Sequence, residues 1–595
     1  MPPPVENLAS IYQNFFCLPS IRRNPLSTPG LLPPGFAPAR PSFLSCRSRE
    51  IVYAGYNLDI GSAPRNAWRH AVKILLGAVI LTLALFLAAC GGGGGVTPPP
   101  PGGNFTLASL KGQYAFSMNG VDPTGAYIAR IGSFISDGAG NITAGLEDVL
   151  PLATGQPAVV NFTGGNYSIQ SNGRGVLVLQ AASGGGLQLN FDMQSPTAGF
   201  LLETDKNNAT SGTFSLQTPA DFTNGSLVSQ YAFNLAGISF GANSVAPISI
   251  VGEINSDGNG AITSGLIDTN DGNAQQPSAA TPVPPGTYQV DTNGNGSSFG
   301  RGTMSFAGRS FAFYIVDSTH FLLLEEDALG GSSGDALKQV SPPSQNSQFA
   351  GNFIFLVGGA SLLGTQGPVA TVGRFTADGN GALNAVTADD NNDGRHVHIQ
   401  NGSNVSNATY TIDANHPGSG RGTFTFTNSG TGTYSFTFYA VSASQAFVQD
   451  TSPGYIATGP MYSQGSGPFS LQNLAGDYVF NWSGVQLANS TAVPLGEDYI
   501  GQFTLANATS NSVNGVVDYT QIGVSSNNLY TNVNLTGNLL IDGDGTADNK
   551  YTFNVNSSPT ATIHFQVYFS SNGTAFMVTA DSTRTTAGVI KLQAP

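Results

Sequence analysis

The stretch best spaced to hold a metal ion lies near the C-terminus. Asp542 and Asp544 are two residues apart, and Asp548 follows four residues later, with small residues between them. Calcium-binding loops present oxygen ligands at alternate positions, so this stretch could hold calcium. The same residues fit a hairpin turn, which is the competing interpretation. Calcium here is the one cofactor that the sequence suggests, and otherwise we expect none.

A second group combines carboxylates with imidazoles. Asp389, Asp390 and Asp393 are followed by His396 and His398. Alternate residues of a strand share a face, so the two histidines could hold a transition metal. A solvated loop explains the same residues, and metal binding is left open.

Three copies of Asp-Gly-x-Gly also begin with a carboxylate, at Asp137, Asp257 and Asp378. Each copy offers one carboxylate among small residues, which is too few ligands for a calcium loop. Asp at the start of a turn and Gly at positive φ are typical of hairpins. We therefore predict turns at all three.

Nucleophilic catalysis has little support in the sequence. Residues 330–334 read Gly-Gly-Ser-Ser-Gly and match G-x-S-x-G. That motif works at a strand-to-helix turn of an α/β fold, whereas here it lies in a polar stretch among β-type segments. We predict that the protein is not an enzyme, and we name no catalytic residue.

These residues belong to a chain that repeats itself four times. An aromatic-x-Phe segment leading to a glycine occurs as LKGQYAFSMNG, LVSQYAFNLAG, FAGNFIFLVGG and LAGDYVFNWSG, and each repeat closes on a glutamine, at Gln217, Gln339, Gln464 and Gln593. The period of about 120 residues is too long for one solenoid turn and indicates four domains. We expect them at 105–219, 220–341, 342–465 and 466–595.

Charged residues recur at fixed places in the first three repeats. An aspartate ends the second block of each, and an arginine lies within a later Gly-Arg-Gly, as Asp148, Asp268 and Asp389 and as Arg174, Arg301 and Arg421. The fourth repeat departs from this pattern, with Asp542-Gly-Asp544-Gly and Lys550 in the later block. An anionic ligand could use the arginines. We favour a structural role, in which Arg donates to turn carbonyls or to the recurring aspartates.

The strand pattern predicts an all-β fold. Repeat one holds about eight strands, which start near Gly112, Tyr127, Asn141, Asn166, Val176, Leu187, Phe200 and Thr213. Short hairpin links make a meander, and eight strands can close into an up-and-down barrel, resembling lipocalin or streptavidin at the level of fold only. Immunoglobulin-like sandwiches are the alternative, although they need longer crossovers. The recurring aromatics are expected to fill the cores.

One segment indicates export. Residues 74–89 are an apolar run after Arg65, Arg69 and Lys73, and the run is shorter than a spanning helix usually needs. Leu87-Ala88-Ala89-Cys90 resembles the lipobox of bacterial lipoproteins. The resemblance implies a signal peptide at 72–89, cleavage before Cys90, and palmitate-type lipid on that residue. Gly91 follows instead of the Asp of inner-membrane retention, so we expect the outer membrane, on an unresolved face.

The segments around this signal are unusual in composition. Residues 90–104 are rich in Gly and Pro and predict a tether that holds a folded body away from a lipid surface. Residues 1–71 are rich in Pro and Arg without periodicity, which predicts disorder. Because a signal peptide should begin a chain, translation is alternatively expected to start near Val72.

Charge and cysteine content narrow the classes of partner. Only 9% of residues are charged, the net charge is −14, and eight of the 21 basic residues precede Cys90. This acidic body argues against nucleic acid as a partner. The cysteines are Cys17, Cys46 and Cys90, so the repeats form no disulfides.

The whole resembles uncharacterised tandem-repeat envelope lipoproteins, a resemblance that implies no activity. We expect a monomeric, lipid-anchored, non-enzymatic protein whose repeats bind an unknown glycan or protein or act structurally, with avidity from repetition. A periplasmic carrier of small ligands and an envelope hydrolase are the alternatives. A carrier requires roomy barrel interiors, and a hydrolase requires a cleft with clustered carboxylates.

Overall fold

The computed structural model describes residues 103–595, apart from short gaps at 152–156, 242–243, 275–276, 293, 364–366, 401, 403, 488–493, 506–510, 525 and 556–557. The predicted signal peptide, Cys90, nearly all of the tether and residues 1–71 lie outside this part of the chain. The domain boundaries and the lipid anchor therefore remain predictions.

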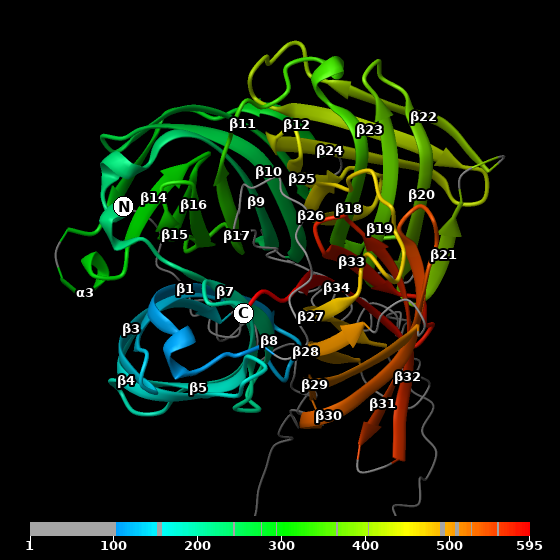
Figure 1. Cartoon of the computed structure of the whole chain (residues 1–595). Helices are drawn as coiled ribbons and strands as arrows, with labels where there is room; N and C mark the ends of the chain where they lie inside the picture. Colours follow the sequence, from blue (N-terminus) through cyan, green and yellow to red (C-terminus); the bar gives the residue numbers. More distant parts are fainter. Residues whose placement is uncertain are drawn as a thin grey trace, which may run out of the picture. The chain divides into compact units, whose positions relative to one another are not determined.

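The described chain is all-β and forms four closed or nearly closed antiparallel barrels, as the strand pattern predicts (Figure 1). Sheets 1 and 4 are closed barrels in which eight strands follow each other in sequence order. Barrel 1 comprises β1 Lys111–Val121, β2 Tyr127–Asp137, β3 Asn141–Pro151, β4 Ala158–Ile169, β5 Arg174–Ala181, β6 Gly186–Ser195, β7 Ala198–Glu203 and β8 Ala209–Leu216. Barrel 4 comprises β27 Gly476–Gln486, β28 Leu495–Leu505, β29 Ser512–Gly523, β30 Ser526–Ile541, β31 Thr546–Val555, β32 Ser558–Phe569, β33 Thr574–Thr579 and β34 Arg584–Leu592.

In barrels 2 and 3 the fourth strand is split in two, so these sheets count nine strands. Barrel 2 comprises β9 Val228–Phe240, β10 Val245–Asp257, β11 Ala261–Asp271, β12 Ser278–Pro282, β13 Gly286–Val290, β14 Arg301–Phe306, β15 Arg309–Asp317, β16 His320–Glu325 and β17 Gly330–Lys338. Barrel 3 comprises β18 Ala350–Ser361, β19 Gly367–Asp378, β20 Leu383–Asn392, β21 Arg395–Ile399, β22 Val405–Ile412, β23 Arg421–Asn428, β24 Gly432–Ser442, β25 Gln445–Asp450 and β26 Tyr455–Ser463.

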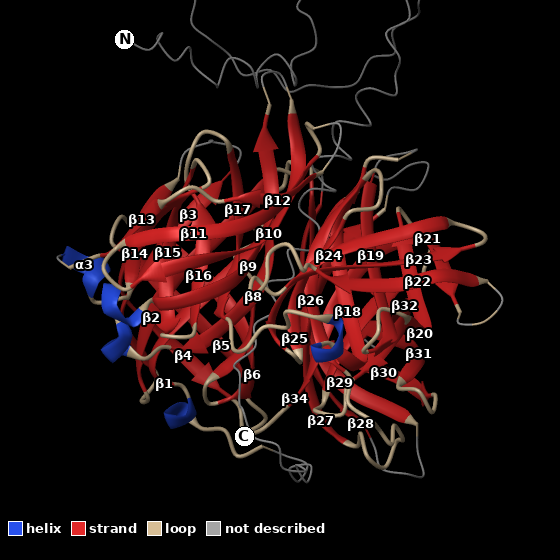
Figure 2. Cartoon of the chain, turned by 90° about the horizontal axis from the view of Figure 1, so that it is seen from above, coloured by secondary structure: helices blue, strands red, loops and turns tan. Residues whose placement is uncertain are grey.

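Among the described residues, the helices are short turns between strands (Figure 2). They are η1 Leu107–Ser109, η2 Pro219–Asp221, η3 Asn224–Ser226, α3 Gly294–Ser297 and η4 Asn346–Gln348.

The Asp-Gly-x-Gly copies form tight turns between the second and third strands of barrels 1 to 3. In the first copy, Asp137 Oδ1 accepts the N–H groups of Ala139 (2.7 Å) and Asn141 (3.0 Å). Gly138 and Gly140 have φ of +79° and +103°, which side chains disfavour. Asp257 and Asp378 accept the equivalent N–H groups. The aspartates therefore fix hairpin geometry, as the turn interpretation predicts.

Aromatic side chains fill the barrel interiors. In barrel 3 the rings of Phe355, Phe375, Phe424 and Phe436 lie with centroids 4.5–6.1 Å apart. The second glycine of Gly-Arg-Gly faces such a ring, because a Cβ on Gly302 would lie 2.3 Å from Phe313 Cζ. The same holds for Gly175 under Phe191 and for Gly422 under Phe438. These glycines recur because a ring occupies the space of their side chain.

The first two strands of each barrel are buried on both faces. In β1, Tyr114 and Phe116 pack into the barrel core, while Ala115 and Val121 join a separate apolar cluster. That cluster also contains residues of the other three barrels, among them Ile238, Ile354 and Val479. The barrels therefore share a core outside their own interiors.

Contacts between barrels follow one rule. The first two strands of a barrel pack on the last three strands of the next: β1 and β2 on β15–β17, β9 and β10 on β24–β26, β18 and β19 on β32–β34. Strands β27 and β28 of barrel 4 pack in the same way on β6–β8 of barrel 1. The four junctions thus form a closed circuit, in which barrel 4 returns to barrel 1.

Candidate functional site

The recurring charged residues meet at these junctions. At junction 1–2, the Arg301 guanidinium reaches Asp148 through two bonds, Nε to Oδ2 (2.8 Å) and Nη2 to Oδ1 (2.6 Å). The Tyr314 hydroxyl donates to the same carboxylate at 2.6 Å. Asp148 is fully buried, and burial beside this carboxylate holds the pKa of Tyr314 well above its usual range. A fork of this kind is the strong geometry for an Arg–carboxylate pair.

Junction 2–3 repeats this arrangement. Arg421 donates to Asp268 at 2.8 and 2.7 Å, and the Tyr439 hydroxyl donates at 2.7 Å. In both junctions the aspartate and the arginine are 153 residues apart. At both junctions the aspartate that accepts from the arginine belongs to the preceding repeat.

Junction 4–1 closes the circuit with altered residues. Arg174 Nη2 lies 2.6 Å from Asp518 Oδ2, so the degenerate fourth copy still supplies the carboxylate. Asp192 stands where barrels 2 and 3 have the junction tyrosine, and its Oδ1 lies 3.3 Å from Arg174 Nε. Burial raises the pKa of Asp192 to about 7.

At junction 3–4, no described arginine of barrel 4 pairs with Asp389. Thr546, and not Lys550, occupies the register position opposite the junction tyrosine, which is Tyr568 here. Asp389 Oδ1 instead contacts His396 Nε2 (2.8 Å) and His398 Nδ1 (2.9 Å), and Tyr568 donates to Oδ2 at 2.5 Å. Burial alone would raise the pKa of Asp389, but the hydrogen bonds from the two histidines and Tyr568 outweigh burial and lower it.

The closing glutamines cross the same junctions. Gln217 Nε2 donates to the carbonyl oxygens of Phe299 (3.0 Å) and Ile315 (2.6 Å) in barrel 2. Gln339 and Gln464 do the same toward barrels 3 and 4. Gln593 donates to Asn172 (2.8 Å) and Met193 (2.7 Å) of barrel 1. The glutamine therefore recurs because each repeat must be fastened to the next.

The candidate metal ligands are occupied by other contacts. Asp544 Oδ2 accepts from Arg374 Nη1 of barrel 3 at 3.0 Å, and Asp542 Oδ2 accepts from Thr546 Oγ1 at 3.3 Å. The side chain of Asp548 lies outside the described residues. His396 and His398 do share a face, but they both face Asp389. In the described part of the chain, no group of three or more His, Cys, Asp or Glu side chains is arranged to hold a metal ion.

The G-x-S-x-G match lies within a strand. Ser332 is buried on β17, and its hydroxyl donates to Glu325 Oε2 at 2.6 Å. This segment is a strand that runs between β9 and β16, so it lacks the strand-to-helix turn that a nucleophile elbow needs.

Ion pairs inside the barrels escaped the sequence analysis. Arg130 bridges Glu147 (3.1 Å) and Glu203 (3.4 Å), Arg309 pairs with Glu325, and Arg584 Nη1 lies 2.9 Å from Glu497 Oε1. The available signal was a carboxylate closing an apolar strand, as in Ala-Gly-Phe-Leu-Leu-Glu203.

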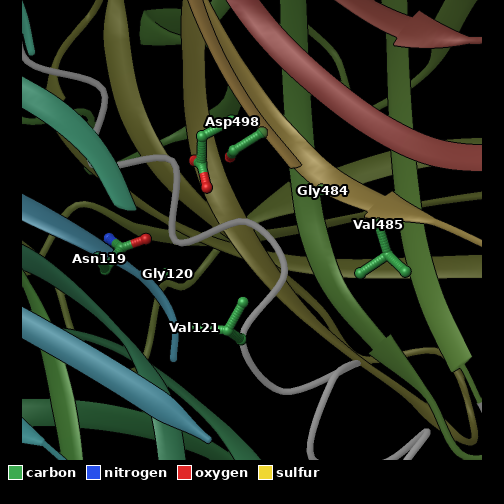
Figure 3. Close-up of a pocket in the computed structure, with 7 residues that line it drawn as sticks. Asn119, Gly120, Val121, Gly484, Val485 and Asp498 are labelled. Atoms are coloured by element: carbon green, nitrogen blue, oxygen red, sulfur yellow. The ribbon is translucent and has the colours of Figure 1, made fainter. Parts of the chain in front are cut away.

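A small cavity lies at junction 4–1. Figure 3 shows Asn119 and Val121 of β1 on one side and Gly484, Val485 and Asp498 of barrel 4 on the other. Its volume of about 10 Å³ is that of about one water. Asp498 accepts from Ser211 at 2.5 Å, and burial raises the pKa of Asp498 to about 7.

No protein-family model and no curated protein matches the chain. Among solved structures, a mutant of transferrin binding protein B from Haemophilus parasuis Hp5 is 8% identical, with a TM-score of 0.19, over 69% of this chain and 86% of that chain. Isotype 1 of the same protein from serogroup B Neisseria meningitidis is 8% identical, with a TM-score of 0.19, over 68% of this chain and 82% of that chain. Kievitone hydratase from Nectria haematococca is 8% identical, with a TM-score of 0.16, over 39% of this chain and 92% of that chain. TM-scores this low carry no functional argument, so function has to be argued from this chain's own residues.

Among the described residues, no helix has both the length and the apolar character to cross a membrane.

Proposed function

We propose that this protein is a lipid-anchored, non-enzymatic component of the bacterial cell envelope, whose four-barrel body binds, or interacts structurally with, an envelope glycan or protein. One observation carries this proposal: the repeated Asp, Arg, Tyr and Gln side chains join the barrels to each other. Repetition therefore builds one cohesive body instead of four copies of a ligand site.

The anchor follows from the lipobox resemblance at Leu87–Cys90. Lipid on Cys90 would hold the chain to the outer membrane, and residues 91–104 would space the barrels from it. We infer a monomer, since the junction faces that could pair copies are used within the chain. The acidic body is unsuited to nucleic acid.

Aromatic packing in the barrels gives no support to the small-ligand carrier. The buried carboxylates next to arginines are hydrogen-bonded within barrels and give no support to a hydrolase.

The test is protease shaving of intact cells, combined with metabolic labelling by a palmitate analogue. We expect the label on the wild-type chain and none on Cys90→Ser. Peptides from residues 105–595 released from intact cells would support surface presentation, and release only after the outer membrane is opened would support a periplasmic role. An unlabelled wild-type chain that fractionates with the cytoplasm would overturn the proposal.

A further inference from the structure

Each of barrels 1 to 3 carries a buried carboxylate at one matched interior position. Glu203, Glu325 and Asp450 end β7, β16 and β25, and they pair in register with Leu189, Phe311 and Phe436. All three are at most 1% exposed. A buried carboxylate is costly unless a cation or hydrogen bonds compensate its charge.

An arginine meets this carboxylate in barrels 1 and 2. Arg130 of β2 lies 3.4 Å from Glu203 and also contacts Glu147, and Arg309 of β15 pairs with Glu325. The two arginines come from different strands, so there are two places from which a guanidinium can reach the site.

Barrel 3 has a hydroxyl residue at both of these places. Thr371 precedes Gly373 by two residues, as Arg130 precedes Gly132, and Tyr434 precedes the junction residue Tyr439 by five, as Arg309 precedes Tyr314. Barrel 3 also adds a carboxylate, Asp390, which is 3% exposed. Hydroxyl oxygen atoms therefore take the place of the guanidinium, while two buried carboxylates remain, as many as Arg130 meets in barrel 1.

The oxygen atoms of this group are incompletely bonded. Asp390 accepts from Thr371 Oγ1 at 2.8 Å and only distantly from the Tyr434 hydroxyl, at 3.5 Å. Asp450 Oδ1 accepts the N–H of Ser452 at 2.8 Å, while its buried Oδ2 has no hydrogen-bond partner. An ion pair to Asp390 or Asp450 is absent among the described residues, and nearby His396 contacts Asp389 instead.

We propose that Asp390 and Asp450, with the hydroxyl oxygens of Thr371 and Tyr434, bind a hard cation inside barrel 3, for which calcium is the best-suited ion. Two carboxylates and neutral oxygens are the ligands that calcium uses, and the absence of nitrogen and sulfur from the set disfavours softer metals. This site lies apart from both metal candidates of the sequence analysis. Burial raises the pKa of Asp390 to about 6 and that of Asp450 to about 7, as expected for a site without its counter-charge.

The test uses the purified full-length chain in detergent, stripped with EDTA. Calcium chloride is titrated while the midpoint of thermal unfolding is followed, and terbium luminescence excited through tyrosine is recorded in parallel, because Tyr434 belongs to the site. We expect half-saturation by calcium at about 10⁻⁴ to 10⁻³ M, the range of extracellular sites. Asp450→Asn should weaken binding at least about tenfold, because it removes one of the two charges.

Two further variants make the result specific. Asp544→Asn changes the calcium candidate of barrel 4 and should leave calcium binding intact. Thr371→Arg restores the guanidinium of barrel 1 and should give a folded chain whose unfolding midpoint no longer depends on calcium, which also answers the objection that Asp450→Asn misfolds. The proposal fails if the wild type shows no stabilisation and no terbium signal up to about 10 mM, or if binding survives Thr371→Arg.

Discussion

Arg301 and Arg421 lie in largely buried positions, where an unpaired guanidinium charge would destabilise the fold. Each is largely buried and each is met by a carboxylate of the preceding barrel and a tyrosine hydroxyl. Removing one partner of a buried pair leaves the other charge uncompensated, which costs more than the pair contributes. The junctions are therefore sensitive to single substitutions.

We expect Arg301→Met to lower the free energy of unfolding by about 3–5 kcal/mol, because Asp148 is left buried and unpaired. Urea denaturation measures the loss. The double variant Arg301→Met/Asp148→Asn should recover much of it. Exposed Arg395→Met should change stability by less than about 0.5 kcal/mol, and an equal loss there would count against the junction interpretation.

Asp498 predicts a pH dependence. Burial raises its pKa to about 7, so the folded chain binds its proton more tightly than the unfolded chain does. The contribution of this group is therefore fully present below the unfolded pKa, near 4, and is lost as the pH rises through about 7, by at most about 1.4 kcal/mol per pH unit.

Urea denaturation across this pH window should show a flatter profile for Asp498→Asn than for the wild type. Exposed Asp378, whose pKa is lowered by hydrogen bonds from the N–H groups of Asn380 and Ala382 against a small effect of burial, serves as control. Asp378→Asn should keep the wild-type slope between about pH 5 and pH 8, and flattening by both variants alike would refute the assignment to Asp498.

At the scale of the elements, the strands that begin with Gly-Arg-Gly show how packing inside a barrel depends on one missing side chain. Gly302 on β14 faces Phe313 on β15, and a Cβ would lie 2.3 Å from the ring and 2.5 Å from the carbonyl oxygen of Gln289. Neither neighbour can move easily, because the ring is buried and the oxygen belongs to the β13 backbone.

Gly302→Ala should therefore lower the free energy of unfolding by about 1–3 kcal/mol through overpacking. Gly543→Ala is the matched control, since nothing lies within 4 Å of its Cβ position. Chemical denaturation measures the free energy of unfolding of both variants. A similar small change in both would show that the Phe313 ring moves aside and would contradict the overpacking prediction.

The strands and turns were more predictable from the sequence than the contacts between repeats were. Alternating strands, hairpin turns and recurring aromatics predict eight-stranded barrels, because those signals are local. The sequence did not reveal that the fourth strand divides in barrels 2 and 3, or that Arg301 pairs with the Asp148 of another repeat. Because the motifs recur in each repeat, they indicate which residue types pair. They do not indicate from which repeats the two partners come. The pairing of Glu203 and Glu325 was not predictable, because their arginine partners, Arg130 and Arg309, lie on different strands of the two barrels.

Over the whole molecule, the circuit of junctions makes the barrels depend on each other. Gln593 fastens barrel 4 to barrel 1, and it is 4% exposed. We expect Gln593→Ala to cost about 1–3 kcal/mol, because the buried Met193 carbonyl oxygen loses this donor, while the Asn172 oxygen still accepts from Gln502 Nε2. Hydrogen exchange should rise in β6–β8, β27 and β28.

Gln217→Ala is the matched control for this prediction, since Gln217 makes the same contacts at junction 1–2. Its effect should fall on β1, β2 and β15–β17. If both variants raised exchange in the same strands, the junctions would not be separable and the circuit would respond as a whole.

The end of the chain returns to its described beginning. The N–H of Ala594 donates to Gln194 of barrel 1 at 2.7 Å, and Pro595 lies against Gly103. A chain that began at any one of the four barrels could therefore form the same circuit of junctions. A short linker could join residue 595 to residue 103, and new termini could open in the segment between β8 and β9. Such a circular permutant would keep every junction and would begin at barrel 2.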